Sequence, residues 1–243
     1  MELKDRLILV TGGAHRLGKE MALHAARLGM NVAITYNAAS AAAEATCAEI
    51  EALGRQALAV RCDQANADQI SEAIDKIASH FGRLDCLVNS ASVLNQKDFF
   101  EITPQEWDEV QAVNTRGPFF FIQTAARLML ASEGGAMINI IDESVLKPSL
   151  EYPHHSISKS GLWALTRLSA IRLAPTIRVN AILPGAVLKP SGWDEARYQA
   201  LAEHVPLKRM GTPQDVCRAL EFLLLSDYIT GQMIVVEGGT TVI

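Results

Sequence analysis

Thr11-Gly12-Gly13-Ala14-His15-Arg16-Leu17-Gly18 stands between a short apolar run, residues 7–11, and a segment with apolar residues at helical spacing, residues 16–28. In a strand, glycine turn and helix arranged this way, free N–H groups at the helix start face a pyrophosphate. Gly12 permits a tight exit from the strand, and Gly18 lets the helix pack close to the sheet. The stretch therefore predicts a dinucleotide-binding turn at the start of a βαβ unit.

Strand-like and helix-like segments alternate along the rest of the chain. The strand-like segments are short and continuously apolar, which is typical of a parallel sheet covered by helices on both faces. The sequence thus predicts an α/β fold, a single Rossmann-type doubly wound domain over residues 1–243 with about seven parallel strands. The expected strands are residues 7–11, 31–36, 57–62, 84–89, 136–141, 178–183 and 233–236. The expected helices are residues 16–28, 39–53, 68–81, 104–131, 153–173, 194–203 and 213–225.

Three irregular stretches, residues 93–103, 142–151 and 183–193, each follow the carboxyl end of an expected strand. Ligands of open α/β sheets bind at that edge. We therefore expect these three loops to form the substrate site.

The composition excludes several classes of partner. The chain has 22 Lys and Arg against 27 Asp and Glu, a net charge of −5, which argues against nucleic acid and against anionic lipid. No apolar run approaches the roughly 18 residues of a membrane span, and no signal-peptide core is visible. The four cysteines lie far apart, so no CxxC metal or redox pair exists. We expect a cytoplasmic protein that binds a small molecule and no metal.

The end of the second expected strand indicates which dinucleotide is bound. An acidic residue there would accept hydrogen bonds from the adenine ribose of NAD, but the sequence reads Thr35-Tyr36-Asn37. Arg16, in the glycine turn, offers a guanidinium that suits a 2′-phosphate. The sequence therefore favours NADP(H) over NAD(H).

These residues resemble the short-chain dehydrogenase/reductase family over nearly the whole chain. Its TGxxxGxG motif is matched at Thr11, Gly12 and Gly18, with Arg16 in place of the middle glycine. Arg16 followed by Leu17-Gly18 is similar to the pteridine reductase branch. Further matches are Asp63, the segment Asn89-Ser90-Ala91-Ser92, Asn114, the turn Pro184-Gly185, and the tail from Pro206 to Gly239. The cofactor-binding residues that follow are Gly12, His15, Arg16, Leu17, Gly18, Tyr36, Asn37, Asp63, Asn89, Ala91, Lys159, Pro184 and Gly185.

The catalytic positions depart from the family pattern. The family uses Tyr-x-x-x-Lys with a serine thirteen residues before the tyrosine, and Asn114 matches its catalytic asparagine. Lys159 fits, but His155 stands at the tyrosine position and Asp142 at the serine position. An aspartate at that position is again similar to pteridine reductases. The resemblance thus implies a site built from Asn114, Asp142, His155 and Lys159.

Three interpretations of His155 stay open. Imidazole is a competent general acid or base, and His155 four residues before Lys159 shares its helix face, so it could replace the tyrosine. The proton could instead come from Asp142, Tyr152 or water. In the third interpretation, the protein binds NADP(H) without catalysis and acts as a sensor or a partner subunit. Asp142 could also orient the imidazole ring.

The substrate is less clearly indicated than the cofactor. Pteridine reductases place an aromatic residue shortly after the NNAG-like segment, where this chain has Leu94. A carbonyl, an alcohol or a pterin-like ring is therefore expected as the reacting group. We expect Leu94, Tyr152 and Trp193 to line the substrate pocket, with Tyr198 as either an aromatic contact or a buried anchor of the loop.

The resemblance also implies a homo-oligomer, a dimer or a tetramer. Family members pack through the helices that follow the fourth and fifth strands. Those helices carry Gly117-Pro118-Phe119-Phe120-Phe121 and Leu162-Trp163-Ala164-Leu165, which fit either the core or a subunit contact.

Overall fold

The computed structural model describes residues 2–189, 192 and 194–243 and contains one seven-stranded parallel sheet. The strand order is β3-β2-β1-β4-β5-β6-β7, so the order reverses between β1 and β4. This reversal is where the carboxyl ends of the strands open a crevice for a ligand. The predicted fold class is confirmed. The strands are β1 Leu7–Val10, β2 Asn31–Tyr36, β3 Ala57–Arg61, β4 Cys86–Asn89, β5 Gly135–Ile140, β6 Ile177–Pro184 and β7 Met233–Val236.

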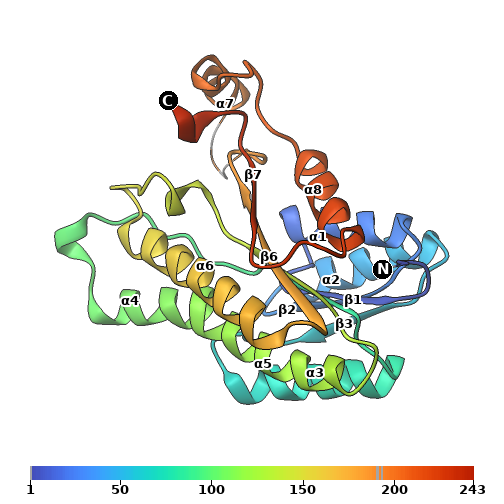
Figure 1. The fold of residues 1–243 in the computed structure, drawn as a ribbon. Coiled ribbons are helices and arrows are strands. Elements are labelled where there is room, and N and C mark those ends of the chain that lie inside the picture. Colours follow the sequence, from blue (N-terminus) through green and yellow to red (C-terminus); the bar gives the residue numbers. More distant parts are fainter. Residues whose placement is uncertain (1, 190–191, 193) are drawn as a thin grey trace.

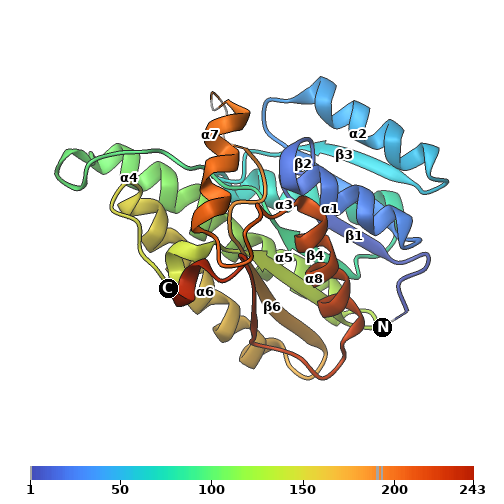
Figure 2. The ribbon, with the colours of Figure 1, turned by 90° about the horizontal axis from the view of Figure 1, so that it is seen from above.

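Helices cover both faces of the sheet, with α1, α2 and α8 on one face and α3, α5 and α6 on the other (Figures 1 and 2). The α-helices are α1 Arg16–Arg27, α2 Ser40–Ala52, α3 Ala67–Phe81, α4 Pro104–Gln111, α5 Gly117–Leu130, α6 Pro153–Leu173, α7 Glu195–Ala200 and α8 Pro213–Leu225. Short 3₁₀ turns lie at Phe99–Glu101, Glu143–Val145, Leu201–His204 and Thr240–Val242. In the described part of the chain, no helix is long and apolar enough to cross a membrane.

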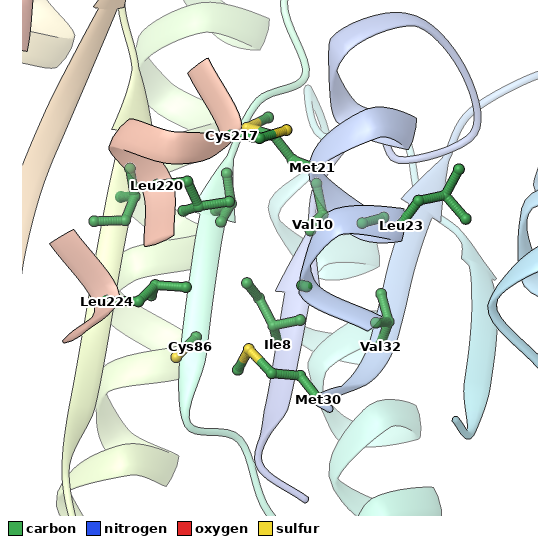
Figure 3. Packing of buried hydrophobic residues seen from close by; sticks show 14 of the residues in the cluster. Ile8, Val10, Met21, Leu23, Met30, Val32, Cys86, Cys217, Leu220 and Leu224 are labelled. Carbon is green, nitrogen blue, oxygen red and sulfur yellow. The ribbon is translucent and has the colours of Figure 1, made fainter. Parts of the chain in front are cut away.

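Alternate residues of each strand build two separate cores. Ile8 and Val10 pack towards α1 and α8, where Met21 and Leu220 meet them (Figure 3). Leu7 and Leu9 point to the opposite face, into the core beneath α3, α5 and α6. All four β1 positions are fully buried, which explains why the strands read as unbroken apolar runs.

The long helix expected over residues 104–131 is interrupted. A π-helical segment, Ala112–Arg116, separates α4 from α5. At its end Gly117 lies so close to the β3–α3 connection that an added Cβ would meet the Gln64 carbonyl oxygen at 2.6 Å. The segment holds Asn114 fully buried, and π-bulges of this kind are common beside functional sites.

Candidate active site

A cavity of about 640 Å³ opens at the carboxyl ends of β1, β2, β4, β5 and β6. Its walls come from the glycine turn, the end of β2, the loops after β3, β4, β5 and β6, and one face of α6. The loops after β4, β5 and β6 are the ones expected to form the substrate site, and residues of all three line the cavity. Most of the predicted cofactor residues line it as well: Gly12, His15, Arg16, Leu17, Gly18, Tyr36, Asn37, Asp63, Ala91, Lys159, Pro184 and Gly185.

The glycine turn leaves no room for side chains on its inner side. An added Cβ on Gly18 would meet the Gly12 carbonyl oxygen at 2.4 Å, and one on Gly12 would meet the Ala91 Cβ at 2.9 Å. Gly12 also adopts a φ of 66°. The N-terminus of α1 has no side-chain cap at His15 and no acidic residue in its first turn. Its N–H groups are therefore free for an anion, so the residues present fit the pyrophosphate of a dinucleotide.

Arg16 has a positive φ of 54°, a conformation that costs a non-glycine residue about 1–2 kcal/mol. It stands where the family motif has glycine, which adopts such a φ without cost. The guanidinium lies on the cavity wall together with Tyr36 and Asn37. The segment 35–39 that lines this end of the cavity contains no carboxylate, as the sequence predicts.

One predicted cofactor residue points elsewhere. Asn89 is buried at the end of β4, and its side-chain amide donates to Asn139 Oδ1 on the neighbouring β5 at 2.8 Å. The Asn89 side chain therefore contacts β5 and is not among the residues that line the cavity. Asn139 in turn donates to Thr166 on α6, so this polar chain links two strands to a helix beneath the site.

Asp142, His155 and Lys159 all line the cavity. His155 Nε2 lies 2.5 Å from Asp142 Oδ2, and the other carboxylate oxygen of Asp142 accepts hydrogen bonds from the backbone N–H and the hydroxyl of Ser144. Lys159 Nζ donates to the Ile140 carbonyl oxygen at 2.9 Å. His155 and Lys159 are each 4% exposed, whereas the Asp142 side chain is 30% exposed. Asp142 is thus the more open member of its pair with His155.

The electrostatics of this group follow from burial and pairing. Burial raises the pKa of Asp142, but the hydrogen bond and charge of His155, with smaller effects of Lys159 and Ser144, outweigh it and lower the pKa to about 2. Burial lowers the pKa of Lys159 to about 8, and the Asp142 carboxylate opposes that shift. At neutral pH Asp142 is therefore a carboxylate, while Lys159 is mainly an ammonium ion.

The chain matches a family model described as enoyl-(acyl carrier protein) reductase over residues 12–241. It is 35% identical over 241 residues to a 3-oxoacyl-(acyl-carrier-protein) reductase from Staphylococcus epidermidis, covering 97% of this chain and 98% of that protein. The chain belongs to the short-chain dehydrogenase/reductase family. Its framework is that of NAD(P)-dependent oxidoreductases.

Solved structures of family members have the same fold. The structure of a putative short-chain alcohol dehydrogenase from Sinorhizobium meliloti superimposes with a TM-score of 0.94 at 31% identity, covering 99% of this chain and 98% of that chain. A FolM alternative dihydrofolate reductase 1 from Brucella canis, complexed with NADP, gives a TM-score of 0.92 at 30% identity, covering 100% of this chain and 97% of that chain.

Asn114, at the position of the family asparagine, lies directly behind His155 and does not line the cavity. Its side-chain nitrogen donates to the Val93 carbonyl oxygen at 2.9 Å and to Ser158 Oγ at 3.0 Å, and lies 3.2 Å from His155 Nδ1. Its side-chain oxygen accepts from the Val93 N–H and from Ser92 Oγ. The π-helical segment therefore places an amide that fixes the loop after β4 against α6.

The predicted substrate-pocket residues have different outcomes. Leu94 lines the cavity and is 57% exposed. Tyr152 precedes α6 and is not among the residues that line this cavity. Tyr198 is buried in a small cluster with Ala202, and its hydroxyl donates to the Ala186 carbonyl oxygen at 3.4 Å, so it anchors its loop. Trp193 lies outside the described residues.

Several contacts in the site have no signal in the sequence. His155 contacts the Val93 carbonyl oxygen, and Lys159 donates to the Ile140 carbonyl oxygen. Every residue type has a backbone carbonyl, so the sequence does not mark these two acceptors. Gln64 could have been found as the polar residue after Asp63. Its amide donates to the carbonyl oxygens of Ala91, at 3.0 Å, and Val113, at 2.6 Å. Within the described residues, no group of three or more His, Cys, Asp or Glu side chains is arranged to hold a metal.

Proposed function

We propose that this protein is an NADP(H)-dependent oxidoreductase that transfers a hydride between the nicotinamide and a small carbonyl, alcohol or pterin-like ring. One observation carries the proposal. Asp142, His155 and Lys159 line the same cavity as the glycine turn. Proton-transfer groups and the cofactor framework therefore share one space. When bound, the dinucleotide supplies or accepts the hydride.

The glycine turn would hold the pyrophosphate, and Lys159 the nicotinamide ribose, as the family pattern implies. Arg16 on the cavity wall, and the absence of a carboxylate in residues 35–39, support NADP(H) over NAD(H). Arg16 and Asp142 together support a place on the pteridine reductase-like branch. The similarity to the dihydrofolate reductase from Brucella canis agrees with that placement.

The hydrogen-bond partners of His155 indicate its protonation. The two hydrogens of the Asn114 amide are used by Val93 and Ser158, so the amide has none left for His155 Nδ1. Nδ1 lies 2.9 Å from the Val93 carbonyl oxygen, which only accepts, so Nδ1 carries a proton. Nε2 faces the ionised Asp142, which also only accepts. The contact between Nε2 and Oδ2 therefore needs one proton, which the two groups share.

This arrangement favours delivery of the proton through Asp142. Neither nitrogen of His155 is free to face a substrate, while the Asp142 side chain is partly open to the cavity. During reduction of a carbonyl, the proton between Nε2 and Oδ2 would move to Asp142, which would pass it to the substrate oxygen. A proton from solvent then restores the hydrogen bond between Nε2 and Oδ2. His155 then acts as a proton store and Asp142 as the donor.

The second candidate function is a non-catalytic NADP(H)-binding protein that acts as a sensor or partner subunit. The observation that favours it is the same pair of hydrogen bonds on His155. An imidazole satisfied on both sides by protein groups also describes a residue with a structural role.

Cofactor binding measured beside NADPH oxidation on a carbonyl panel and a pterin panel tests the proposal. We expect turnover, and a loss of about 100-fold or more in kcat in His155→Ala and in Asp142→Asn with NADPH affinity kept, since positioned acids contribute on that scale. His155→Tyr serves as the family-like control. NADPH binding without turnover of any substrate, unchanged in His155→Tyr, would establish the second candidate instead. A gain of activity in His155→Tyr would identify a decayed enzyme.

We also propose that the chain forms a homo-oligomer through α5 and α6. Phe121, Leu162 and Leu165 belong to the core, which leaves these residues unavailable for a subunit contact. Other apolar residues on the same helices are exposed, namely Phe119, Leu168 and Ile171 at 41%, 62% and 80%. Exposed apolar side chains on neighbouring helices support a self-association surface there.

A further inference from the structure

Arg61 is the last residue of β3, the edge strand beside β2. In the parallel register it pairs with Tyr36, the last residue of β2, and the following Cys62 N–H donates to the Tyr36 carbonyl oxygen at 2.8 Å. The two strands therefore end at the same level. Cys62 and Asp63 line the cofactor cavity, so Arg61 directly precedes its wall.

One hydrogen bond fixes the Arg61 side chain at the rim of that cavity. Arg61 Nε donates to the Asn37 carbonyl oxygen at 3.2 Å, and Asn37 itself lines the cavity. The bond uses only Nε. Among the described residues, no protein acceptor takes a hydrogen bond from the terminal nitrogens Nη1 and Nη2, and the side chain is in no salt bridge. Nη1 and Nη2 of the exposed guanidinium can therefore donate hydrogen bonds to a ligand.

The charge around this rim suits an anion. Residues 35–39 are uncharged, and α2 begins after them without an acidic residue in its first turn. Glu44, further along α2, accepts from Ser40 Oγ, and one oxygen of Asp63 accepts from the Ala65 N–H. Arg16 lines the same end of the cavity. Two guanidinium groups therefore lie near residues 35–39, a segment without a carboxylate, and one oxygen of the Asp63 carboxylate is already paired with a backbone N–H.

We propose that Arg61 is a second binding residue for the 2′-phosphate of NADP(H), acting with Arg16 from a different element of the rim. The proposal rests on the proposed function, because it deepens the preference for NADP(H). A phosphate monoester offers several acceptor oxygens to a planar guanidinium, which binds it with two parallel hydrogen bonds. The Asn37 carbonyl positions Arg61 for this task. The end of β2 lacks an acidic residue, and Arg61 at the end of the neighbouring β3 supplies a positive charge beside it.

Fluorescence titration of the intact protein tests the proposal without reference to turnover. The probes are NADPH and 2′,5′-ADP, which carry the 2′-phosphate, and NADH and 5′-AMP, which lack it. We expect Arg61→Gln to raise the Kd of the first two probes about tenfold, the scale of one charge-assisted pair, and to leave the other two unchanged. Arg61→Lys should lose less affinity, since it keeps the charge but not the fork. The double variant Arg16→Gln/Arg61→Gln should lose more than either single variant.

Arg27→Gln is the matched control, because Arg27 is an exposed arginine at the other end of α1. If Arg61→Gln changes the ratio of NADPH to NADH affinity no more than Arg27→Gln does, the proposal is overturned. If the wild-type protein prefers NADPH and Arg61→Gln keeps that preference, the role of Arg61 is overturned and the proposed preference for NADP(H) stands. A wild-type protein that binds NADH and NADPH equally defeats the cofactor preference, and Arg61 with it. Circular dichroism of each variant confirms that the fold is kept.

Discussion

At the scale of single residues, two adjacent histidines on α6 have opposite environments. His155 has a partner on each ring nitrogen, whereas both ring nitrogens of His154 are buried without any partner. His154 is fully buried, and burial, together with the charge of His155, lowers its pKa against an opposing effect of Glu106. One histidine is thus built into the site, and its neighbour weakens the fold that supports it.

We predict that His154→Leu stabilises the protein by about 1–2 kcal/mol at neutral pH, because it removes a buried polar group without partners. The gain should grow as the pH falls below about 6.5, the ordinary pKa of histidine. The sign follows from the lowered pKa in the folded state. Below pH 6.5 the unfolded chain binds the proton and the folded chain does not, so the wild type loses stability as the pH falls.

Urea unfolding of wild type and His154→Leu at several pH values between 5 and 8 measures both effects. His80→Leu serves as the control, since His80 is an exposed residue of α3. A difference between wild type and His154→Leu that is independent of pH would show that His154 does not resist protonation.

At the scale of elements, the glycine turn and the π-helical segment set the positions of the site. The turn is local in sequence, so its role could be predicted from glycine spacing. The π-helical segment could not, because the periodicity of residues 104–131 fits one continuous helix. Where the π-helical segment ends, Gly117 lies close to the backbone at Gln64, which is far away in the chain.

We predict that Gly18→Ala lowers stability by more than about 2 kcal/mol and weakens NADPH binding, because the new Cβ would force the backbone at Gly12 to move. Gly54→Ala is the comparison. Gly54 ends α2 with a φ of 77° and has open space around it, so only backbone strain of about 1 kcal/mol is expected there. Thermal unfolding and NADPH titration measure the two effects. If both variants lose the same stability and NADPH affinity, the lack of space for a Cβ at Gly18 does not explain the effect.

At the scale of the whole molecule, the exposed apolar residues of α6 bear on assembly. We predict that Leu168→Glu/Ile171→Glu shifts the protein towards the monomer, because two carboxylates would be buried in any interface on that face. Sedimentation velocity measures the change. Leu53→Glu, at the end of α2, is an exposed apolar position away from α6 and should leave assembly unchanged. Oligomers that persist in the double variant would place the interface elsewhere.

The sequence by itself determined the sheet, the order of its helices and the position of the glycine turn. Apolar runs, helical periodicity and glycine spacing are local properties, and they fix strand, helix and turn before any long-range contact forms. Helical spacing also placed His155 beside Lys159, and the resemblance to the family added Asp142 to that site. The sequence did not determine the direction of Asn89, which turns to β5, or the exclusion of Tyr152 from the cavity.

The tertiary structure alone decided the partners in the site. His155 Nδ1 meets a carbonyl 62 residues earlier in the chain, and Arg61 at the end of β3 reaches the carbonyl of Asn37 after the neighbouring β2. Backbone carbonyls are the same in every residue, so no side-chain pattern marks the ones that will accept these bonds. Their positions depend on how loops and strand ends lie together after folding. For this protein, tertiary contacts therefore decide which partners His155 and Arg61 have.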